Sequence, residues 1–254
     1  MMTNISASEE RRQTRRQTLL ISAIGVVIVY VLWNIPALDI FTYPVRLFVT
    51  YVHELSHSLM AIITGGEIIG FTISPDGSGV ATTRGGISAL VLPAGYLGAA
   101  FFGSLLFYLV NTIRKPRFLS ILIGAALIIF TTLYARPNDQ GQLSALLIGW
   151  AFGALLALVG WKLHTIINQL LLNVLSILLA LNSVLDLFIL VRSTSAVIVT
   201  RNGVIRNDAA AFSERVAPII PPVVWAVLWA LIAIVMLCTA IYFSIIRPMR
   251  TSQK

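Results

Sequence analysis

Long apolar runs separated by short polar segments make up most of the chain. About 20 apolar residues suffice for a helix to cross the hydrocarbon core of a bilayer, and most of the runs approach or exceed this length. The pattern therefore predicts an all-α polytopic membrane protein with about seven transmembrane helices. The predicted spans are Thr18–Ile40, Val45–Thr64, Ile87–Val110, Phe118–Tyr134, Leu143–Trp161, Ile166–Leu190 and Val223–Ile246.

The segment at 65–86 breaks this pattern. Its sequence, GGEIIGFTISPDGSGVATTRGG, alternates β-branched and small residues around Pro75-Asp76-Gly77. This arrangement is typical of a strand, a turn and a second strand, so we expect a small β-hairpin after the second span. A hairpin beside a membrane needs its edges paired with protein or facing a polar cavity.

The composition supports a membrane protein. Of the 254 residues, 57% are hydrophobic and 11% charged, with a mean hydropathy of +0.89, which leaves too little polar surface for a soluble domain. The net charge is +8, and the arginines lie mostly at span ends, which suits lipid headgroups and predicts no nucleic-acid partner. A single cysteine, Cys238, excludes an internal disulfide framework and a multi-cysteine metal site.

The chain shows no internal repeat and no low-complexity linker. We therefore expect a single membrane domain at 18–246, between a basic cytoplasmic tail at 1–17 and a basic tail at 247–254. The first apolar run is too long for a signal peptide and predicts an uncleaved anchor. The polar segment at 192–222 is expected to be a loop at the membrane surface.

Four ionisable side chains lie in the interior of the predicted spans, away from the span ends: His53, Glu54 and His57 in the second and Asp186 in the sixth. A single such group is usually a packing hydrogen bond, but several together usually face a cavity or an ion. Residues four apart share a helix face, so His53 and His57 can direct both imidazoles at one ion. With Glu54 beside them as general base, the His-Glu-x-x-His spacing predicts a zinc metallopeptidase site.

Two histidines leave a catalytic zinc one protein ligand short. Asp186 is carried by a separate apolar helix, where an unpaired carboxylate is costly and a dication removes that cost. We therefore predict Asp186 as the third metal ligand. The remaining acids lie in a tail, at a span end, in the hairpin or in polar loops: Glu9, Glu10, Asp39, Glu67, Asp76, Asp139, Asp208 and Glu214.

With these residues the chain resembles the site-2 protease-like intramembrane zinc metallopeptidases. The resemblance rests on HELSH at His53–His57, TGG at Thr64–Gly66, the hairpin, PAGYLG at Pro93–Gly98 and NSVLD at Asn182–Asp186. It covers about 45–190, the expected metallopeptidase-like core, and is closest to a compact branch of the family without a PDZ-like insertion.

The resemblance implies hydrolysis of peptide bonds in membrane-embedded or membrane-associated substrates, with Zn²⁺ as the cofactor. Zinc would activate a water and polarise the scissile carbonyl, while Glu54 would take the proton of the water and pass it to the leaving amine. The late family motif supplies a metal-binding aspartate, here Asp186, and Asn182 corresponds to a substrate or backbone contact. This chain has Leu187 where the family usually has glycine, and it lacks the usual proline between Asn182 and Asp186. The hairpin could add a strand to an extended substrate.

Two other classes of function fit the same residues. One is a non-catalytic subunit of a larger membrane complex, of unidentified partner, that retains a zinc site. The other is a metal or proton transporter, which should carry more ionisable groups in its other spans. Glu54 discriminates the peptidase from the non-catalytic subunit, because hydrolysis requires a base whereas a structural site requires only His53, His57 and Asp186.

Two signals disagree about the topology of the 45–64 segment. With the N-terminal arginines on the cytoplasmic side of a cell membrane, seven crossings place ten basic residues inside and eight outside, whereas a re-entrant segment gives eleven and seven. Seven crossings, however, put His57 and Asp186 at depths that differ by only about 5 Å. We therefore predict seven crossings, with the metal nearer the cytoplasm and the 192–222 loop cytoplasmic.

Overall fold

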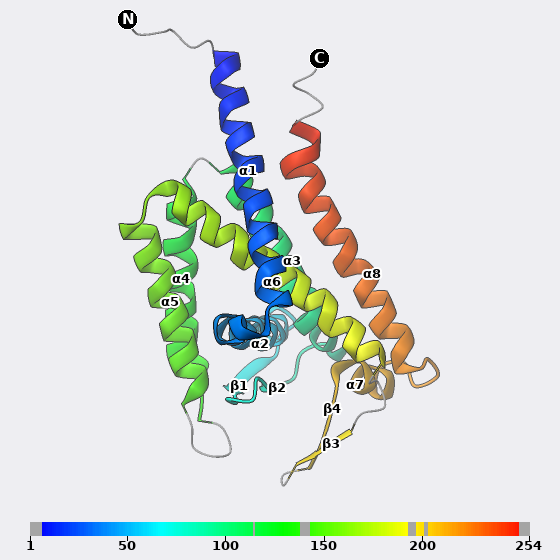
Figure 1. The fold of residues 1–254 in the computed structure, drawn as a ribbon. Helices are drawn as coiled ribbons and strands as arrows, with labels where there is room; N and C mark the ends of the chain where they lie inside the picture. The colour runs from blue at the N-terminus through cyan, green and yellow to red at the C-terminus, as the bar shows by residue number, and fades with distance from the viewer. Residues whose placement is uncertain (1–6, 114, 138–142, 193–196, 201–202, 249–254) are drawn as a thin grey trace, which may run out of the picture.

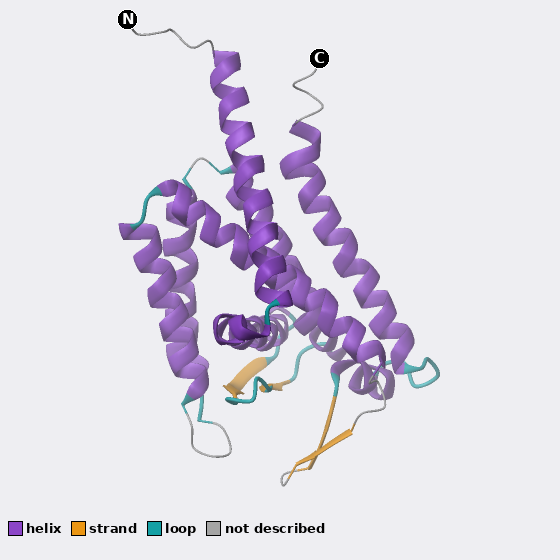
Figure 2. Ribbon diagram, viewed as in Figure 1, coloured by secondary structure: helices purple, strands orange, loops and turns teal. Residues whose placement is uncertain are grey.

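The computed structural model describes residues 7–113, 115–137, 143–192, 197–200 and 203–248, and helices dominate them (Figures 1 and 2). This confirms the predicted mainly helical fold with a small hairpin after the second long helix. The helices are α1 (Ala7–Asn34), η1 (Pro36–Leu38), α2 (Asp39–Ile63), α3 (Ser88–Thr112), α4 (Pro116–Tyr134), α5 (Ser144–Lys162), α6 (Thr165–Arg192), α7 (Asp208–Arg215), α8 (Pro222–Ile241) and η2 (Tyr242–Ile246). The strands are β1 (Glu67–Ile73), β2 (Gly79–Arg84), β3 (Val197–Thr200) and β4 (Gly203–Arg206).

Five helices of the described chain are long and apolar enough to cross a bilayer: α3, α4, α5, the Thr165–Phe188 part of α6, and α8 with η2. The apolar stretch found in α1, Leu19–Leu32, is shorter. Helix α2 is not among these five helices, because its polar side chains lower its mean hydropathy. The protein is therefore a multi-pass membrane protein, but the predicted count of about seven spans is not confirmed.

Helix α2 runs across the other long helices. It is seen end-on in Figure 1, whereas α1, α4, α5 and α8 extend along the length of the molecule. Its buried face packs on the hairpin and on α5, where Phe48 stacks on Phe152 with 4.6 Å between ring centroids, and Tyr51 meets Phe71 edge-on at 5.0 Å. The hydroxyl of Tyr51 also shares a 2.6 Å hydrogen bond with Thr131 of α4. These contacts hold α2 in its position across the other long helices.

Small residues let the membrane helices approach closely. A Cβ placed on Gly124 of α4 would lie 2.5 Å from the carbonyl oxygen of Gly153 in α5, and one on Gly153 would lie 2.8 Å from the carbonyl oxygen of Gly124. Because lipid provides no hydrophobic force between helices, such close packing supplies much of their association energy.

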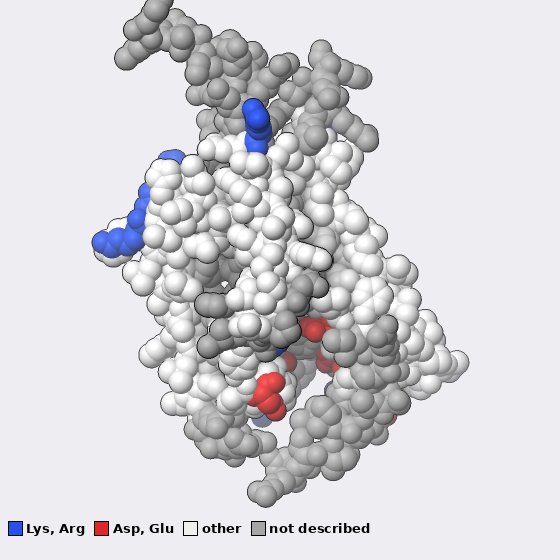
Figure 3. Space-filling view, viewed as in Figure 1, with Lys and Arg blue, Asp and Glu red and all other residues white. Residues whose placement is uncertain are grey.

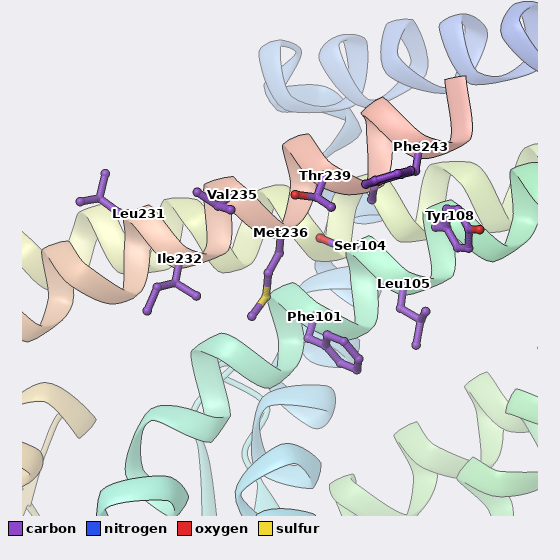
Figure 4. Close-up of a pocket in the computed structure, with 11 residues that line it drawn as sticks. Phe101, Ser104, Leu105, Tyr108, Leu231, Ile232, Val235, Met236, Thr239 and Phe243 are labelled. Carbon is purple, nitrogen blue, oxygen red and sulfur yellow. The ribbon is translucent and has the colours of Figure 1, made fainter. Parts of the chain in front are cut away.

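An apolar groove of about 630 Å³ lies between α3 and the α8–η2 helix (Figure 4). It belongs to the apolar surface of the membrane helices and shares no lining residue with the cavity described below. Its walls include Phe101, Leu105 and Tyr108 on one side and Leu231, Val235 and Phe243 on the other.

Strands β1 and β2 form the predicted antiparallel hairpin, with Phe71 opposite Ala81 and an irregularity between Ile68 and Gly70. The outer edge of β1 is closed, because the backbone N–H of Arg136 donates to the carbonyl of Phe71 at 3.0 Å. Phe71 and Ile73 are fully buried. The hairpin is therefore anchored through β1, while β2 forms its other edge.

Helix α7 folds back against α8. The side chain of Asn207 caps its first turn by accepting a 2.9 Å hydrogen bond from the N–H of Ala210. Phe212 packs on Trp225 and Trp229 of α8, with ring centroids 4.6 and 5.5 Å apart. The polar segment at 192–222 was expected to be only a surface loop, but its described part contains this docked helix.

The chain direction can be followed in Figure 1. Helix α1 begins and η2 ends at the same end of the molecule. The β1–β2 hairpin, the antiparallel pair β3–β4 and α7 lie at the opposite end. On the face shown in Figure 3, Lys and Arg gather at the first end and acids surround a hollow near the second. Counted along the sequence, a chain in which α2 does not cross has eleven of its 18 basic residues on the side of the N-terminal segment. The crosswise course of α2 is compatible with this re-entrant arrangement, and the number of crossings stays a prediction.

Single cysteines in a Cys238→Ser background test this arrangement. We expect a cysteine at Ser8 and one at Lys162 to react with an impermeant thiol reagent from the same side of the membrane, and one at Ser78 from the other. Seven crossings predict that Ser8 and Ser78 share a side, so labelling of that pair together would contradict the arrangement.

Candidate metal centre

Two imidazoles of α2 converge at the inner face of the helix. His53 and His57 are one turn apart, and their Nε2 atoms lie 3.0 Å from each other. The Nδ1–H of His57 donates a 2.7 Å hydrogen bond to the carbonyl of Val91 in α3. Because this bond holds the proton on Nδ1, the lone pair of a neutral His57 is on Nε2, as metal binding requires.

The carboxylate of Asp208 completes the group from α7. Its Oδ2 lies 3.1 Å from Nε2 of His53 and 3.3 Å from Nε2 of His57. Burial raises the pKa of Asp208, but the neighbouring imidazoles of His57 and His53 outweigh burial and lower it overall. The ionised carboxylate is the form of Asp208 that a metal ion would bind.

The spacing of these three atoms fits a metal ion. Zinc–nitrogen and zinc–oxygen bonds of about 2.0–2.1 Å in a tetrahedron place neighbouring ligand atoms ~3.3 Å apart. Residue 95 of α3 packs against both imidazoles and is glycine: a Cβ there would lie 2.3 Å from Nε2 of both His53 and His57. A larger residue at position 95 would therefore displace the two imidazoles.

Glu54 lies beside the group and is 6% exposed. It lines a cavity of about 600 Å³ together with His57, Asp208 and strand β2. Gly79, the first residue of β2, packs against the Glu54 side chain, since a Cβ there would lie 2.8 Å from Cγ of Glu54. The carboxylate also interacts with the backbone of Ala81. Glu54 is therefore held between the metal ligands and the strand.

The structure offers a candidate third ligand other than the predicted Asp186. Among the described His, Cys, Asp and Glu residues, the group with ligand atoms within 4.8 Å of one another consists of His53, His57 and Asp208. Asp186 is close enough to act electrostatically on His53 but is not a member. The amide of Asn182 donates to Leu178 in its own helix at 2.8 Å, and its expected contact with substrate stays a prediction.

The sequence alone favours Asp186 over Asp208, because Asp208 lies in a polar segment far along the chain from the His-Glu-x-x-His motif. The sequence does contain a local signal for it. Asn207 is a favourable N-cap residue, and the DAAAF that follows places Asp208 and Phe212 four apart, on one face of a helix. What the sequence does not show is that Phe212 docks on Trp225 and Trp229.

The family model for Peptidase M50B-like proteins matches residues 21–240, which include every residue of this site. The chain belongs to the Peptidase M50B-like family. This confirms the resemblance to site-2 protease-like metallopeptidases. No curated protein and no solved structure matches the chain.

In this Peptidase M50B-like protein, Gly95→Ala should abolish metal binding, because the added methyl group would lie 2.3 Å from Nε2 of both His53 and His57 and would push the imidazoles out of position. Metal content of the purified protein, measured by plasma mass spectrometry, is the readout. Gly25→Ala is the matched control, since its Cβ would meet no atom closer than 3.4 Å. Full metal content in Gly95→Ala would show that the ion does not bind here.

Proposed function

We propose that the protein is a zinc peptidase that hydrolyses peptide bonds of membrane-embedded or membrane-associated substrates. The observation that carries this proposal is the tetrahedral spacing of His53, His57 and Asp208 beside a buried Glu54. Bound Zn²⁺ would lower the pKa of a water and polarise the scissile carbonyl. We assign the third ligand to Asp208 rather than Asp186 because only the former reaches both imidazoles.

The protein side chains then have distinct roles. His53 and His57 hold the metal, with the Val91 carbonyl fixing the orientation of the His57 ring. Glu54 accepts a proton from the attacking water and delivers it to the nitrogen of the leaving amine. Packing against Gly79 restricts the movement of the Glu54 side chain. Glu54 therefore accepts and releases its proton within the cavity.

Strand β2 suits an extended substrate. One edge of the hairpin is closed by Arg136, while residues 79–83 of the other strand line the cavity that contains Glu54 and His57. A peptide bond in a membrane helix is protected by its own hydrogen bonds, so the substrate must unwind before attack. A strand added along β2 would replace those hydrogen bonds beside the metal.

The sidedness of the site follows from the arrangement of the helices. We propose that the N-terminal segment is cytoplasmic in the cell membrane, as its arginines suggest. Because the hairpins and α7 lie at the end opposite the start of α1, cleavage would then take place toward the non-cytoplasmic face.

The base is tested by Glu54→Gln, which keeps the shape of the side chain. We expect the variant to retain its metal and to lose at least roughly 100-fold in the rate of cleaving a membrane substrate, the usual range for loss of a general base. Wild-type cleavage that persists in this variant would remove Glu54 from the mechanism. A metal-loaded wild-type protein that cleaves nothing across a membrane proteome would support the non-catalytic subunit instead.

The third ligand is tested by comparing Asp208→Asn with Asp186→Asn. Each change removes one negative charge from a partly buried carboxylate with little change in volume. We expect Asp208→Asn to reduce zinc affinity by more than tenfold, because one of three protein ligands is weakened, and Asp186→Asn to leave it within about threefold. Competitive titration with a chelating indicator gives the affinities, and the reverse order would return the ligand role to Asp186.

A further inference from the structure

The cavity beside the metal centre contains one cation among its lining residues, Arg215. The other charged or metal-binding groups in that lining are Glu54, His57 and Asp208, which the proposed function already employs. The rest of the lining is aliphatic, hydroxyl-bearing or glycine. Arg215 is therefore a functional group of the cavity that the hydrolytic chemistry does not use.

The position of Arg215 relative to the metal follows from α7. Arg215 is seven residues after Asp208, so the two lie near the same face of the helix, two turns apart. At 1.5 Å per residue their backbones are separated by about 10 Å. An extended chain advances about 3.3 Å per residue, so this distance corresponds to roughly three substrate residues.

Arg215 is exposed, and no ion pair or hydrogen bond of its side chain is found within the described residues. Arg84, at the end of β2, differs from Arg215 in two respects. Its Nη1 lies 3.0 Å from the Oε1 of Glu67, and it is not part of the cavity lining. Arg84 is thus an ion-paired arginine on the same hairpin that borders the cavity, whereas the guanidinium of Arg215 is available to a ligand.

We infer that Arg215 forms a carboxylate-binding subsite, selecting substrates with a carboxylate about three residues from the scissile bond. A guanidinium matches a carboxylate by paired hydrogen bonds. The carboxylate is either an acidic side chain or the C-terminus of the peptide. The inference rests on the proposed function, because it takes the bound peptide to extend along β2 past the metal.

The experiment uses the full-length, zinc-loaded Glu54→Gln protein in nanodiscs, so that binding is measured without cleavage. The probes are fluorescent apolar peptides carrying one Asp or one Asn at each successive position, each with a free or an amidated C-terminus. We expect a tenfold preference for Asp at one position, or for the free C-terminus, which distinguishes the two carboxylate sources. A second substitution, Arg215→Ala, should abolish the preference, and Arg215→Glu should transfer it to peptides with Lys at that position.

Arg84→Ala is the matched control and should leave the preference unchanged, while zinc content reports that each variant is folded. A preference that survives Arg215→Ala, or peptide binding without any positional preference, would overturn the inference and leave the proposed function intact. Failure of all peptides to bind, together with no cleavage by the wild type, would overturn both.

Discussion

The convergence of two imidazoles and one carboxylate within about 3.3 Å of one another is the constraint on which the surrounding structure depends. Polar groups withdrawn from water are costly unless they are compensated. The fold supplies that compensation from three directions: α2 carries the pair of histidines, α7 brings Asp208, and α3 provides the Val91 carbonyl and, at Gly95, a residue small enough to pack against both imidazoles.

The contribution of α7 ties the metal centre to α8. A helix of eight residues is too short to be stable by itself in water. Its stability comes from the Asn207 cap, from Phe212 packed between Trp225 and Trp229, and from the hydrogen bond of Ser213 to the carbonyl of Ile220 at 2.6 Å. The position of a metal ligand thus depends on aromatic packing some 20 residues further along the chain.

The crosswise course of α2 explains why a polar site occurs in so apolar a protein. Lying across the bundle, the helix faces the β1–β2 hairpin and a polar cavity, and its charged residues need not pass through lipid. Strand β2, a buried base and a candidate metal position then meet in one place. This combination is what hydrolysis of an extended chain requires, and it uses no ionisable group in α4, α5 or α8.

The sequence by itself determined the local features. Apolar runs predicted most membrane helices, turn residues predicted the β1–β2 hairpin, and the spacing of His53, Glu54 and His57 predicted their shared face, because each depends on neighbours within a few residues. Only the tertiary structure decided the course of α2 and the approach of Asp208 to the two imidazoles. Both depend on contacts between residues far apart in the chain, such as Tyr51 with Thr131 and Phe212 with Trp229. From the sequence, an aspartate in an apolar helix looks a better metal ligand than one in a polar segment, but only packing fixes where each carboxylate lies.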